Sequence, residues 1–289
     1  MTQIAFLGTG LLGAAFVEAA LQRGDSVTVW NRTPEKARAL EKFGARIAAT
    51  PDDAVRGAKR VHLVLKDDAV VETVIDALRP GLAADTILVD HTTTQPTLTA
   101  ERSRRLNSEG VRYLHCPVFI GPAVARQSQG TILVAGPQAH YDAVKSDLAR
   151  MATRVEYFGE RPDLAAVYKL CGNAFIIGIN ANVADVFAIA AGARVASADT
   201  IKILDFFNPS AIIAGRGKNM IAGDYTPNFE LEMARKDVRL MLETAGDAPL
   251  AALTGVAARM DQLIAEGHSA DDLAVIGKDS VRTQATEAT

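Results

Sequence analysis

Short apolar runs alternate with longer mixed stretches over the first half of the chain. The short runs predict buried strands at residues 3–8, 26–30, 60–65, 86–90 and 131–136. Apolar residues at helical spacing fill most of the stretches between them, and two helices are expected at residues 11–22 and 33–43. This strand–helix alternation is typical of a doubly wound, mainly parallel sheet with helices on both faces.

The pattern changes close to residue 162. From there on the residues predict helices with no convincing strand between them. These helices are expected at residues 164–191, 198–207, 230–244 and 250–267, with Asn208-Pro209 and Thr226-Pro227 as breaks. The sequence therefore predicts an α/β domain over residues 1–162 and an all-helical domain over residues 163–289, joined by a long helix over about 163–192.

The composition of the chain limits the kinds of binding partner that are expected. Hydrophobic residues make up 48% of the 289 residues, charged residues make up 22%, and the formal net charge is -3. This ordinary globular balance favours neither a nucleic-acid partner nor an anionic membrane. The two cysteines, Cys116 and Cys171, form no disulfide framework and no metal-ligand spacing. We therefore expect no metal site, and two reduced thiols in a cytoplasmic protein.

The apolar run over residues 164–191 is long enough to cross a membrane, but polar residues interrupt it. They are Lys169, Asn173, Asn180, Asn182 and Asp185. Polar and charged side chains are costly in lipid. A buried helix in a soluble protein is therefore expected here.

A glycine motif follows the first expected strand and begins the first expected helix. It reads Gly8-Thr9-Gly10-Leu11-Leu12-Gly13. In this context the first glycine permits a tight turn, the second lets the backbone approach a pyrophosphate, and the third lets the helix pack on the strand. The free N–H groups at the helix N-terminus then bind the phosphates. The motif predicts a Rossmann dinucleotide-binding domain.

The end of the second expected strand indicates which dinucleotide binds. Enzymes that use NAD usually have Asp or Glu there, but this strand ends in Asn31-Arg32-Thr33. Arg32 can pair with a 2′-phosphate, and Asn31 and Thr33 can add hydrogen bonds, so NADP(H) is predicted. The alternative is that Arg32 is an unpaired surface charge.

Two later strand ends should complete the cofactor site, because ligands bind at the carboxyl ends of parallel strands. One carries Leu65-Lys66-Asp67-Asp68, and the other carries residues 90–96, with Thr92 and Thr93. Both could equally be ordinary turns that cap a following helix.

Three polar residues share one stripe of the long apolar helix. At about 100° per residue, Asn173 lies roughly 40° from Lys169, and Asn180 lies roughly 20° from it. A buried ammonium is costly unless it is paired or used, which makes Lys169 a candidate catalytic residue. The alternative is a lysine that extends to solvent, with asparagines that bond to nearby backbone. The histidines His62, His91, His115 and His140 have no partner spacing and are interpreted as core or surface residues.

Five ordered motifs in this chain resemble those of the β-hydroxyacid dehydrogenase family, which includes 3-hydroxyisobutyrate dehydrogenases and glyoxylate/succinic semialdehyde reductases. The resemblance runs from about Ile4 to Gly277. The motifs are the glycine motif with Trp30-Asn31-Arg32-Thr33, the segment 90–96, Cys116-Pro117-Val118 followed by Gly130-Thr131-Ile132, Lys169 to Asn173, and the pair 224–229 and 235–238.

The resemblance implies a role for each matching position. Lys169 would be the general acid/base and Asn173 its helper, while Thr93 and Lys236 would contact the cofactor near the nicotinamide. The expected substrate contacts are Thr92, Phe119, Ile120, Gly121, Asn180 and Phe229. The family is commonly dimeric or tetrameric, so a homo-oligomer that acts on a small molecule is expected. The substrate would be a semialdehyde or β-hydroxy acid.

Two departures from the family pattern bear on the substrate. The family usually has Ser-Gly-Gly after Pro-Val, where this chain has Phe119-Ile120-Gly121, and Gly172 replaces the first of two asparagines. Phe119 lacks a hydroxyl and adds apolar bulk, which favours a less polar carbonyl. An imine reductase is the first alternative, although such enzymes usually have Asp or Tyr in place of Lys169. A non-catalytic module that binds NADPH is the second.

Overall fold

The computed structural model describes residues 2–281 and divides into two compact units. The first extends to Asn173 and the second begins at Ala174. Helix α8 (Leu164–Gly192) contains the point of division and forms where the interdomain helix was predicted. The domain limits at residues 162 and 163 remain a prediction.

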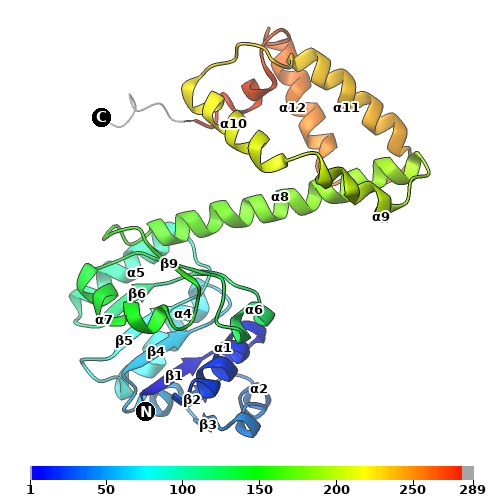
Figure 1. Cartoon of the computed structure of the whole chain (residues 1–289). Coiled ribbons are helices and arrows are strands. Elements are labelled where there is room, and N and C mark those ends of the chain that lie inside the picture. The colour runs from blue at the N-terminus through cyan, green and yellow to red at the C-terminus, as the bar shows by residue number, and fades with distance from the viewer. Residues whose placement is uncertain (1, 282–289) are drawn as a thin grey trace. The chain divides into compact units, whose positions relative to one another are not determined.

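Six parallel strands form the main sheet of the first unit (Figure 1). The strands are β1 (Gln3–Leu7), β2 (Ser26–Trp30), β3 (Arg46–Ile47), β4 (Arg60–Leu63), β5 (Ile87–Asp90) and β6 (Arg112–His115). Their order across the sheet is β3-β2-β1-β4-β5-β6, so the chain winds in one direction from β1 to β3 and in the other from β4 to β6. This reversal beside β1 is where doubly wound sheets bind ligands, at the carboxyl ends of the strands. The predicted fold class is confirmed.

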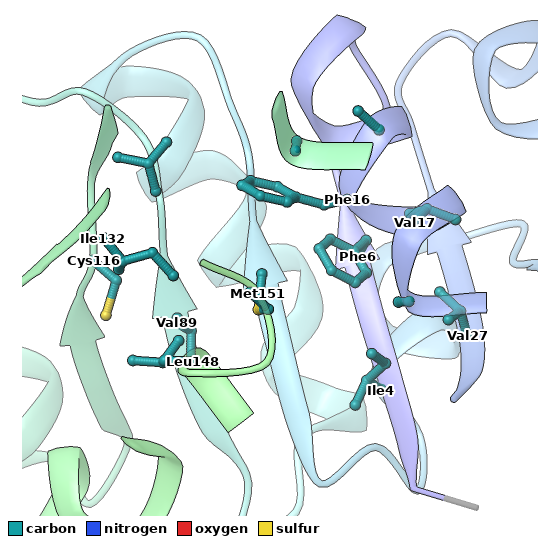
Figure 2. Packing of buried hydrophobic residues seen from close by; sticks show 14 of the residues in the cluster. Ile4, Phe6, Phe16, Val17, Val27, Val89, Cys116, Ile132, Leu148 and Met151 are labelled. Atoms are coloured by element: carbon teal, nitrogen blue, oxygen red, sulfur yellow. The ribbon is translucent and has the colours of Figure 1, made fainter. Parts of the chain in front are cut away.

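Helices connect the strands and bury both faces of this sheet. They are α1 (Leu11–Gln22), α2 (Pro34–Arg38), α3 (Pro51–Val55), α4 (Asp68–Leu78), α5 (Pro96–Ser108), α6 (Pro122–Arg126) and α7 (Gln138–Leu148), with 3-10 turns at Glu41–Phe43 and Arg79–Gly81. Figure 2 shows the core on one face, where Phe6 on β1 lies against Phe16 on α1 with ring centroids 6.5 Å apart. Leu7, Leu63 and Leu88 point into the opposite face.

A second, three-stranded sheet follows the main one. It contains β7 (Val118–Phe119), β8 (Thr131–Val134) and β9 (Arg154–Tyr157), with β7 antiparallel and β9 parallel to β8. The strand predicted over 131–136 therefore forms, but not in the parallel sheet. Where the chain leaves β6, Pro117 has no N–H to continue the ladder after Cys116. Its carbonyl instead accepts a hydrogen bond from the N–H of Leu133.

In the part that the structure describes, the second unit consists of helices joined by loops, with one isolated β-bridge between Glu230 and Asp272. After α8 come α9 (Ser197–Thr200), a 3-10 turn (Ile201–Asp205), α10 (Pro209–Ala222), α11 (Leu231–Ala245), α12 (Leu253–Ala265) and a 3-10 turn (Leu273–Gly277). The helix predicted over 198–207 is replaced by α9 and the first of these turns. Helix α10 was not predicted, because Asn208-Pro209 was interpreted as a break. It is a helix start: Asn208 caps the N–H of Ser210, and Pro209 occupies the first turn.

Helix α8 differs from its prediction in one respect. It was expected to be buried, yet only 6% of an apolar 18-residue stretch within it is buried, and Phe175, Ile176 and Ile177 are exposed. Among residues 2–281 it is the one helix whose length and composition would suit a membrane span. A helix that is apolar all round normally needs a partner surface, and few side chains in this part of α8 are buried among residues 2–281.

Candidate functional site

The glycine motif forms a tight turn between β1 and α1. Gly8 has a φ of +98°, and a Cβ there would lie 2.2 Å from the carbonyl oxygen of Val64. A Cβ on Gly13 would lie 2.0 Å from the carbonyl oxygen of Gly8. Both glycines are therefore required by close backbone packing. A Cβ on Gly10 would meet nothing within 4 Å, which leaves that side of the turn open to a ligand.

The N-terminus of α1 has the features of an anion site. Gly10 is its N-cap residue and supplies no side-chain cap. The first N–H groups of a helix have no partner within the helix, so those that follow Gly10 can bind a phosphate. Leu11, 83% exposed, and Leu12 lie in this first turn, where the motif predicts cofactor contact.

Asn31 connects this turn to the end of β2. Its Oδ1 accepts a hydrogen bond of 2.9 Å from the N–H of Thr9, and its Nδ2 donates one of 3.0 Å to the carbonyl of Thr33. The amide thereby fixes the glycine turn relative to the segment that carries Arg32. Thr9 is buried, and its hydroxyl has no hydrogen-bond partner among the described residues. Asn31 and Thr9 therefore support the glycine turn through hydrogen bonding and packing.

A cavity of about 380 Å³ lies beside the glycine turn. Seven predicted cofactor residues line it: Gly8, Gly10, Asn31, Arg32, Thr33, Leu65 and Lys66. Six further lining residues were not predicted: Trp30, Lys36, Val64, Val70, Thr73 and Val74. The lining combines apolar side chains with an asparagine, two threonines and three cationic side chains, and it contains no carboxylate. Such a surface suits an adenosine group that carries an extra phosphate.

Arg32 and Lys36 are the cations at the β2 end of this cavity. Both are exposed, and neither has an ion-pair partner in the described part of the chain. Lys66, at the other side, lies 3.7 Å from Asp67. Lys36 follows Arg32 by four residues, on the first turn of α2. That spacing was the available signal for Lys36, but its meaning depends on where α2 begins.

The segment after β5 forms hydrogen bonds that hold the loop lining the cavity. Thr92 is buried, and its Oγ1 accepts a hydrogen bond of 3.1 Å from the N–H of Leu65, a lining residue. Asp90 is buried as well and accepts from the N–H of Thr92 at 2.9 Å. Thr93 is exposed, as a cofactor contact would require. Thr92, predicted as a substrate contact, has its hydroxyl oriented toward the cofactor loop.

Lys169 lies on the second turn of α8, half-buried in the first unit. Its Nζ donates a hydrogen bond of 2.9 Å to Oδ1 of Asn173, and it lies 4.2 Å from the centroid of the Phe119 ring. The helical stripe predicted from spacing therefore brings the first two polar residues together. Burial lowers the pKa of the Lys169 ammonium from its ordinary value. A lysine with a lowered pKa gives up its proton more readily near neutral pH.

The start of α8 is anchored against the second sheet. Ala165 is buried and packs with Leu133 of β8, and Phe158 stacks on Tyr168 with ring centroids 4.4 Å apart. These contacts fix the orientation of the helix about its axis, so that Lys169 lies against Phe119. Phe119, at the end of β7, packs into the same cluster, and Ile120 packs against the main core. Gly121 is exposed and caps α6.

Three of the predicted residues belong to the second unit. Asn180 is exposed, and its Nδ2 donates to the carbonyl of Ile176 on its own helix. Phe229 is 36% exposed, and Lys236 forms an ion pair of 2.9 Å with Asp237. Their roles remain predictions that follow from the family resemblance. Asp272 was not predicted: it is buried and accepts hydrogen bonds from the N–H groups of Asn228 and Phe229, so it holds the Phe229 segment.

Three histidines lie inside the first unit, as core residues. His62, His91 and His115 are buried, and His62 stacks on Phe6. His62 Nδ1 lies 3.0 Å from His91 Nε2, and His91 Nδ1 lies 2.7 Å from the carbonyl of Cys116. The carbonyl must accept, so neutral His91 accepts from His62. Burial lowers the pKa of His91 to about 4. Among residues 2–281, no group of His, Cys, Asp or Glu could hold a metal ion.

A glycine turn, an uncapped helix end and a cationic cavity together define a dinucleotide-binding domain of the Rossmann class. The family comparison agrees. The model of the NAD binding domain of 6-phosphogluconate dehydrogenase matches residues 3–159, more than half of the chain. The chain belongs to that family, and its predicted membership of the β-hydroxyacid dehydrogenases is confirmed.

Two curated proteins illustrate the range of relatives. An uncharacterized oxidoreductase of Shewanella frigidimarina is 29% identical over 265 residues, which cover 88% of this chain and 90% of that protein. The cytokine-like nuclear factor N-PAC of Homo sapiens is 29% identical over 257 residues, 85% of this chain. The matched region is 45% of N-PAC, so this chain spans less than half the length of that relative.

Solved structures share the fold over nearly the whole chain. The imine reductase of Streptomyces aurantiacus has a TM-score of 0.87 at 24% identity and covers 97% of this chain and 100% of its own. The reductive aminase of Aspergillus terreus, in complex with NADPH and ethyl levulinate, has a TM-score of 0.85 at 23% identity, with coverages of 96% and 98%. At this identity the likeness establishes the fold.

Proposed function

We propose that this protein is an NADP(H)-dependent oxidoreductase that transfers a hydride between the nicotinamide and a carbonyl or alcohol carbon, with Lys169 as general acid/base. The observation that carries the proposal is the half-buried Lys169 amine, hydrogen-bonded at 2.9 Å to Asn173, in the same unit as the glycine turn. The substrate is a semialdehyde or β-hydroxy acid, or a less polar carbonyl compound, because Phe119 replaces a hydroxyl-bearing residue.

NADP(H) is preferred over NAD(H) because of the charges around the cavity. Arg32 and Lys36 line it beside the end of β2, and no lining residue is acidic. A carboxylate there would accept from the ribose hydroxyls of NAD and repel a 2′-phosphate. Arg32 can instead form a forked pair with that phosphate, and Lys36 can add a second charge. The open side at Gly10 and the uncapped α1 provide room for the pyrophosphate.

The residues of this chain have two tasks in the reaction. When bound, the nicotinamide supplies the hydride that is added to the substrate carbon. Lys169, as an ammonium, donates a hydrogen bond to the substrate oxygen, stabilises the negative charge that develops there, and transfers a proton to it. Asn173 holds the amine in position. In the reverse direction neutral Lys169 accepts the alcohol proton, so oxidation is favoured at higher pH.

A substrate panel tests this proposal. We expect faster oxidation of NADPH than of NADH in the presence of semialdehydes, α-keto acids or ketones. Lys169→Ala should lower turnover by about 10²–10⁴-fold while NADPH still binds. Lys145→Ala is the matched control, because Lys145 is an exposed lysine on α7 that pairs with Asp142. Full activity in Lys169→Ala would refute the role of the amine.

An imine reductase is the second candidate function. The structural likeness to imine reductases and to a reductive aminase supports it, as does the apolar ring of Phe119 beside the amine. In that case Lys169 would donate its proton to the substrate nitrogen. Cyclic imines in the same panel separate the two functions. If the protein binds NADPH but turns over neither class, the third reading, a non-catalytic NADPH-binding module, gains support.

We also infer that two copies of the chain, or a multiple of two, assemble through α8. Phe175, Ile176 and Ile177 are exposed on it, and an apolar patch of this kind marks an interaction site. A bilayer is a poor occupant, since Asn180 and Asp185 lie in the same stretch. A second copy offers the same apolar face, as symmetric homo-oligomers do. A cytoplasmic location remains the prediction from two free cysteines.

A further inference from the structure

The aromatic ring of Phe119 lies against the reactive end of Lys169. The Nζ atom of Lys169 is 4.2 Å from the ring centroid, within the range in which an ammonium is attracted to an aromatic face. Phe119 ends the short strand β7, whereas Lys169 lies on α8, so two separate elements bring this pair together. The ring offers the ammonium an attractive surface that cannot accept its proton.

Gly172 makes room for this ring. It lies on α8 three residues after Lys169, and a Cβ there would lie 2.1 Å from Cζ of Phe119 and 2.7 Å from its Cε1. Any other residue at position 172 would therefore push the ring away from its present place. Glycine is unfavourable inside a helix by about 1 kcal/mol relative to alanine. Its presence in α8 is explained by the close approach of the ring.

The arrangement leaves part of the amine available. An ammonium has three N–H donors, and Oδ1 of Asn173 accepts one of them. The ring attracts the positive charge on another side without an acceptor atom. We propose that Phe119 is a positioning residue that holds the Lys169 ammonium against Asn173 and leaves its remaining donors for the substrate heteroatom. The inference rests on the proposed function of Lys169.

The ring also bears on the charge state of Lys169. Its apolar bulk contributes to the burial that lowers the pKa of the amine, while its negative face favours the ammonium. Among residues 2–281, no charged group on the surrounding elements forms an ion pair with Lys169 that would outweigh these two effects of the ring. The titratable groups on α8 are the exposed Tyr168 and Cys171. Asp163, which precedes α8, is paired with Arg161, and Cys116, which precedes β7, has a buried thiol. Lys169 forms no ion pair within the described residues.

Two substitutions remove the ring from the amine by different routes. Phe119→Leu keeps an apolar side chain but lacks an aromatic face. Gly172→Ala keeps the ring but displaces it through the added methyl group. Gly255→Ala is the control for a glycine inside a helix, since a Cβ there would meet nothing within 4 Å and the residue lies on α12, away from α8 in the sequence. The double variant Phe119→Leu/Gly172→Ala tests whether the two routes act on one contact.

The pH profile of NADPH-dependent reduction gives the first readout. Because reduction needs the ammonium, it declines as the pH rises through the pKa of Lys169. In both single variants this decline should move down by about 0.5–1 pH unit, because the attraction of the ring is lost while the site stays apolar. Gly255→Ala should leave it in place, and the double variant should add no further shift. A lower kcat with an unmoved profile would indicate a merely structural ring and would overturn the proposal.

A second readout does not depend on catalysis. Trace acetylation of the protein at a series of pH values, followed by peptide mass spectrometry, reports the protonation of Lys169, with the other lysines as internal references. The midpoint for Lys169 should fall in Phe119→Leu and in Gly172→Ala. If it falls but no substrate is reduced, the positioning role stands and the proposed function fails. If the midpoint stays or rises in Phe119→Leu, the positioning role is wrong.

Discussion

Nζ of Lys169 lies 2.9 Å from Oδ1 of Asn173, one helical turn further along α8. The two side chains come from one rigid element, so their distance does not depend on the placement of any loop. Because Asn173 is an amide, it accepts from the ammonium without adding a negative charge. Burial therefore lowers the pKa of Lys169 without an opposing ion pair.

Replacement of Asn173 should affect turnover and its pH dependence separately. Asn173→Ala removes the acceptor, and a hydrogen bond to a charged group is worth about 1.5–3 kcal/mol, so kcat for reduction should fall by about 10–100-fold. Asn173→Asp places a carboxylate beside the ammonium and raises the pKa of Lys169. Reduction by Asn173→Asp should consequently persist to higher pH than in the wild type. Steady-state kinetics from pH 6 to about 10 measure both effects; identical profiles in all three proteins would contradict this role for Asn173.

Removal of the cavity cations should weaken binding of one cofactor only. Arg32→Ala or Lys36→Ala should raise KM for NADPH by about 10–100-fold, since each loses a charge-assisted contact with the 2′-phosphate. KM for NADH should change little. Arg32→Asp should reverse the preference, because a carboxylate repels the phosphate and accepts from ribose. Lys42→Ala is the control, as this nearby lysine does not line the cavity. Equal losses for both cofactors would argue against a 2′-phosphate site.

The two glycines Gly10 and Gly13 should respond in opposite ways to the same methyl group. In Gly13→Ala the Cβ would meet the carbonyl oxygen of Gly8 at 2.0 Å, so the protein should lose at least about 1–3 kcal/mol of unfolding free energy. In Gly10→Ala the Cβ meets nothing, so stability should be kept. The methyl would then occupy the side open to the pyrophosphate, and KM for NADPH and NADH should rise together. Thermal melts and kinetics on both variants decide; unchanged KM values in Gly10→Ala would exclude this side as the phosphate site.

Features determined by local sequence were the ones that could be predicted. Helix α1 has the predicted bounds, Leu11–Gln22, because a glycine turn begins it and apolar residues recur along it. Strands β3, β6, β7 and β9 were not predicted. Strands β3 and β7 have only two residues each, β9 is only partly buried, and β6 (Arg112–His115) has no continuous apolar run. The Asn208-Pro209 pair signals either an end or a start, and only the helix that follows decides between them.

In the candidate site, too, only the features set by local sequence could be predicted. Lys169 and Asn173 share a helical turn, so their spacing was sufficient to pair them. The contact of Phe119 with Lys169 and Gly172 joins a strand to a helix about 50 residues later, as the printed sequence shows. Neither its geometry nor the purpose of Gly172 follows from local pattern. The lining role of Lys36 likewise needed the position of α2 relative to the glycine turn.

A charge on the exposed face of α8 should prevent self-association. Ile177 is 69% exposed in the single chain. If a second copy covers it, Ile177→Glu buries an unpaired carboxylate in the assembled protein, which is strongly unfavourable. Sedimentation or light scattering should then show a monomer, against a dimer or tetramer for the wild type. Leu98→Glu, at an apolar surface position 45% exposed on α5, should leave the mass unchanged. A monomeric wild type would refute the assembly.

The buried histidines should make the protein less stable in mild acid. The pKa of His91 is lowered by burial to about 4, from 6.5. Below pH 6.5 the unfolded chain therefore binds a proton that the folded chain does not bind. The contribution of neutral His91 to the free energy of unfolding is fully present above this pH and is lost as the pH falls toward 4. From these two values His91 alone should cost about 2 kcal/mol of unfolding free energy at pH 5. The pKa values of His62 and His115 are lowered by burial too, which adds to the loss.

Urea unfolding at pH 7.5 and pH 5 measures this loss directly. His91→Gln keeps an amide donor for the carbonyl of Cys116 but does not titrate. It should be less stable than the wild type at pH 7.5, because a stacked ring and the hydrogen bond from His62 are replaced. At pH 5 the deficit should shrink by about 2 kcal/mol, since only the wild type loses the His91 contribution. A deficit of equal size at both pH values would mean that His91 does not titrate on unfolding and that the acid sensitivity has another origin.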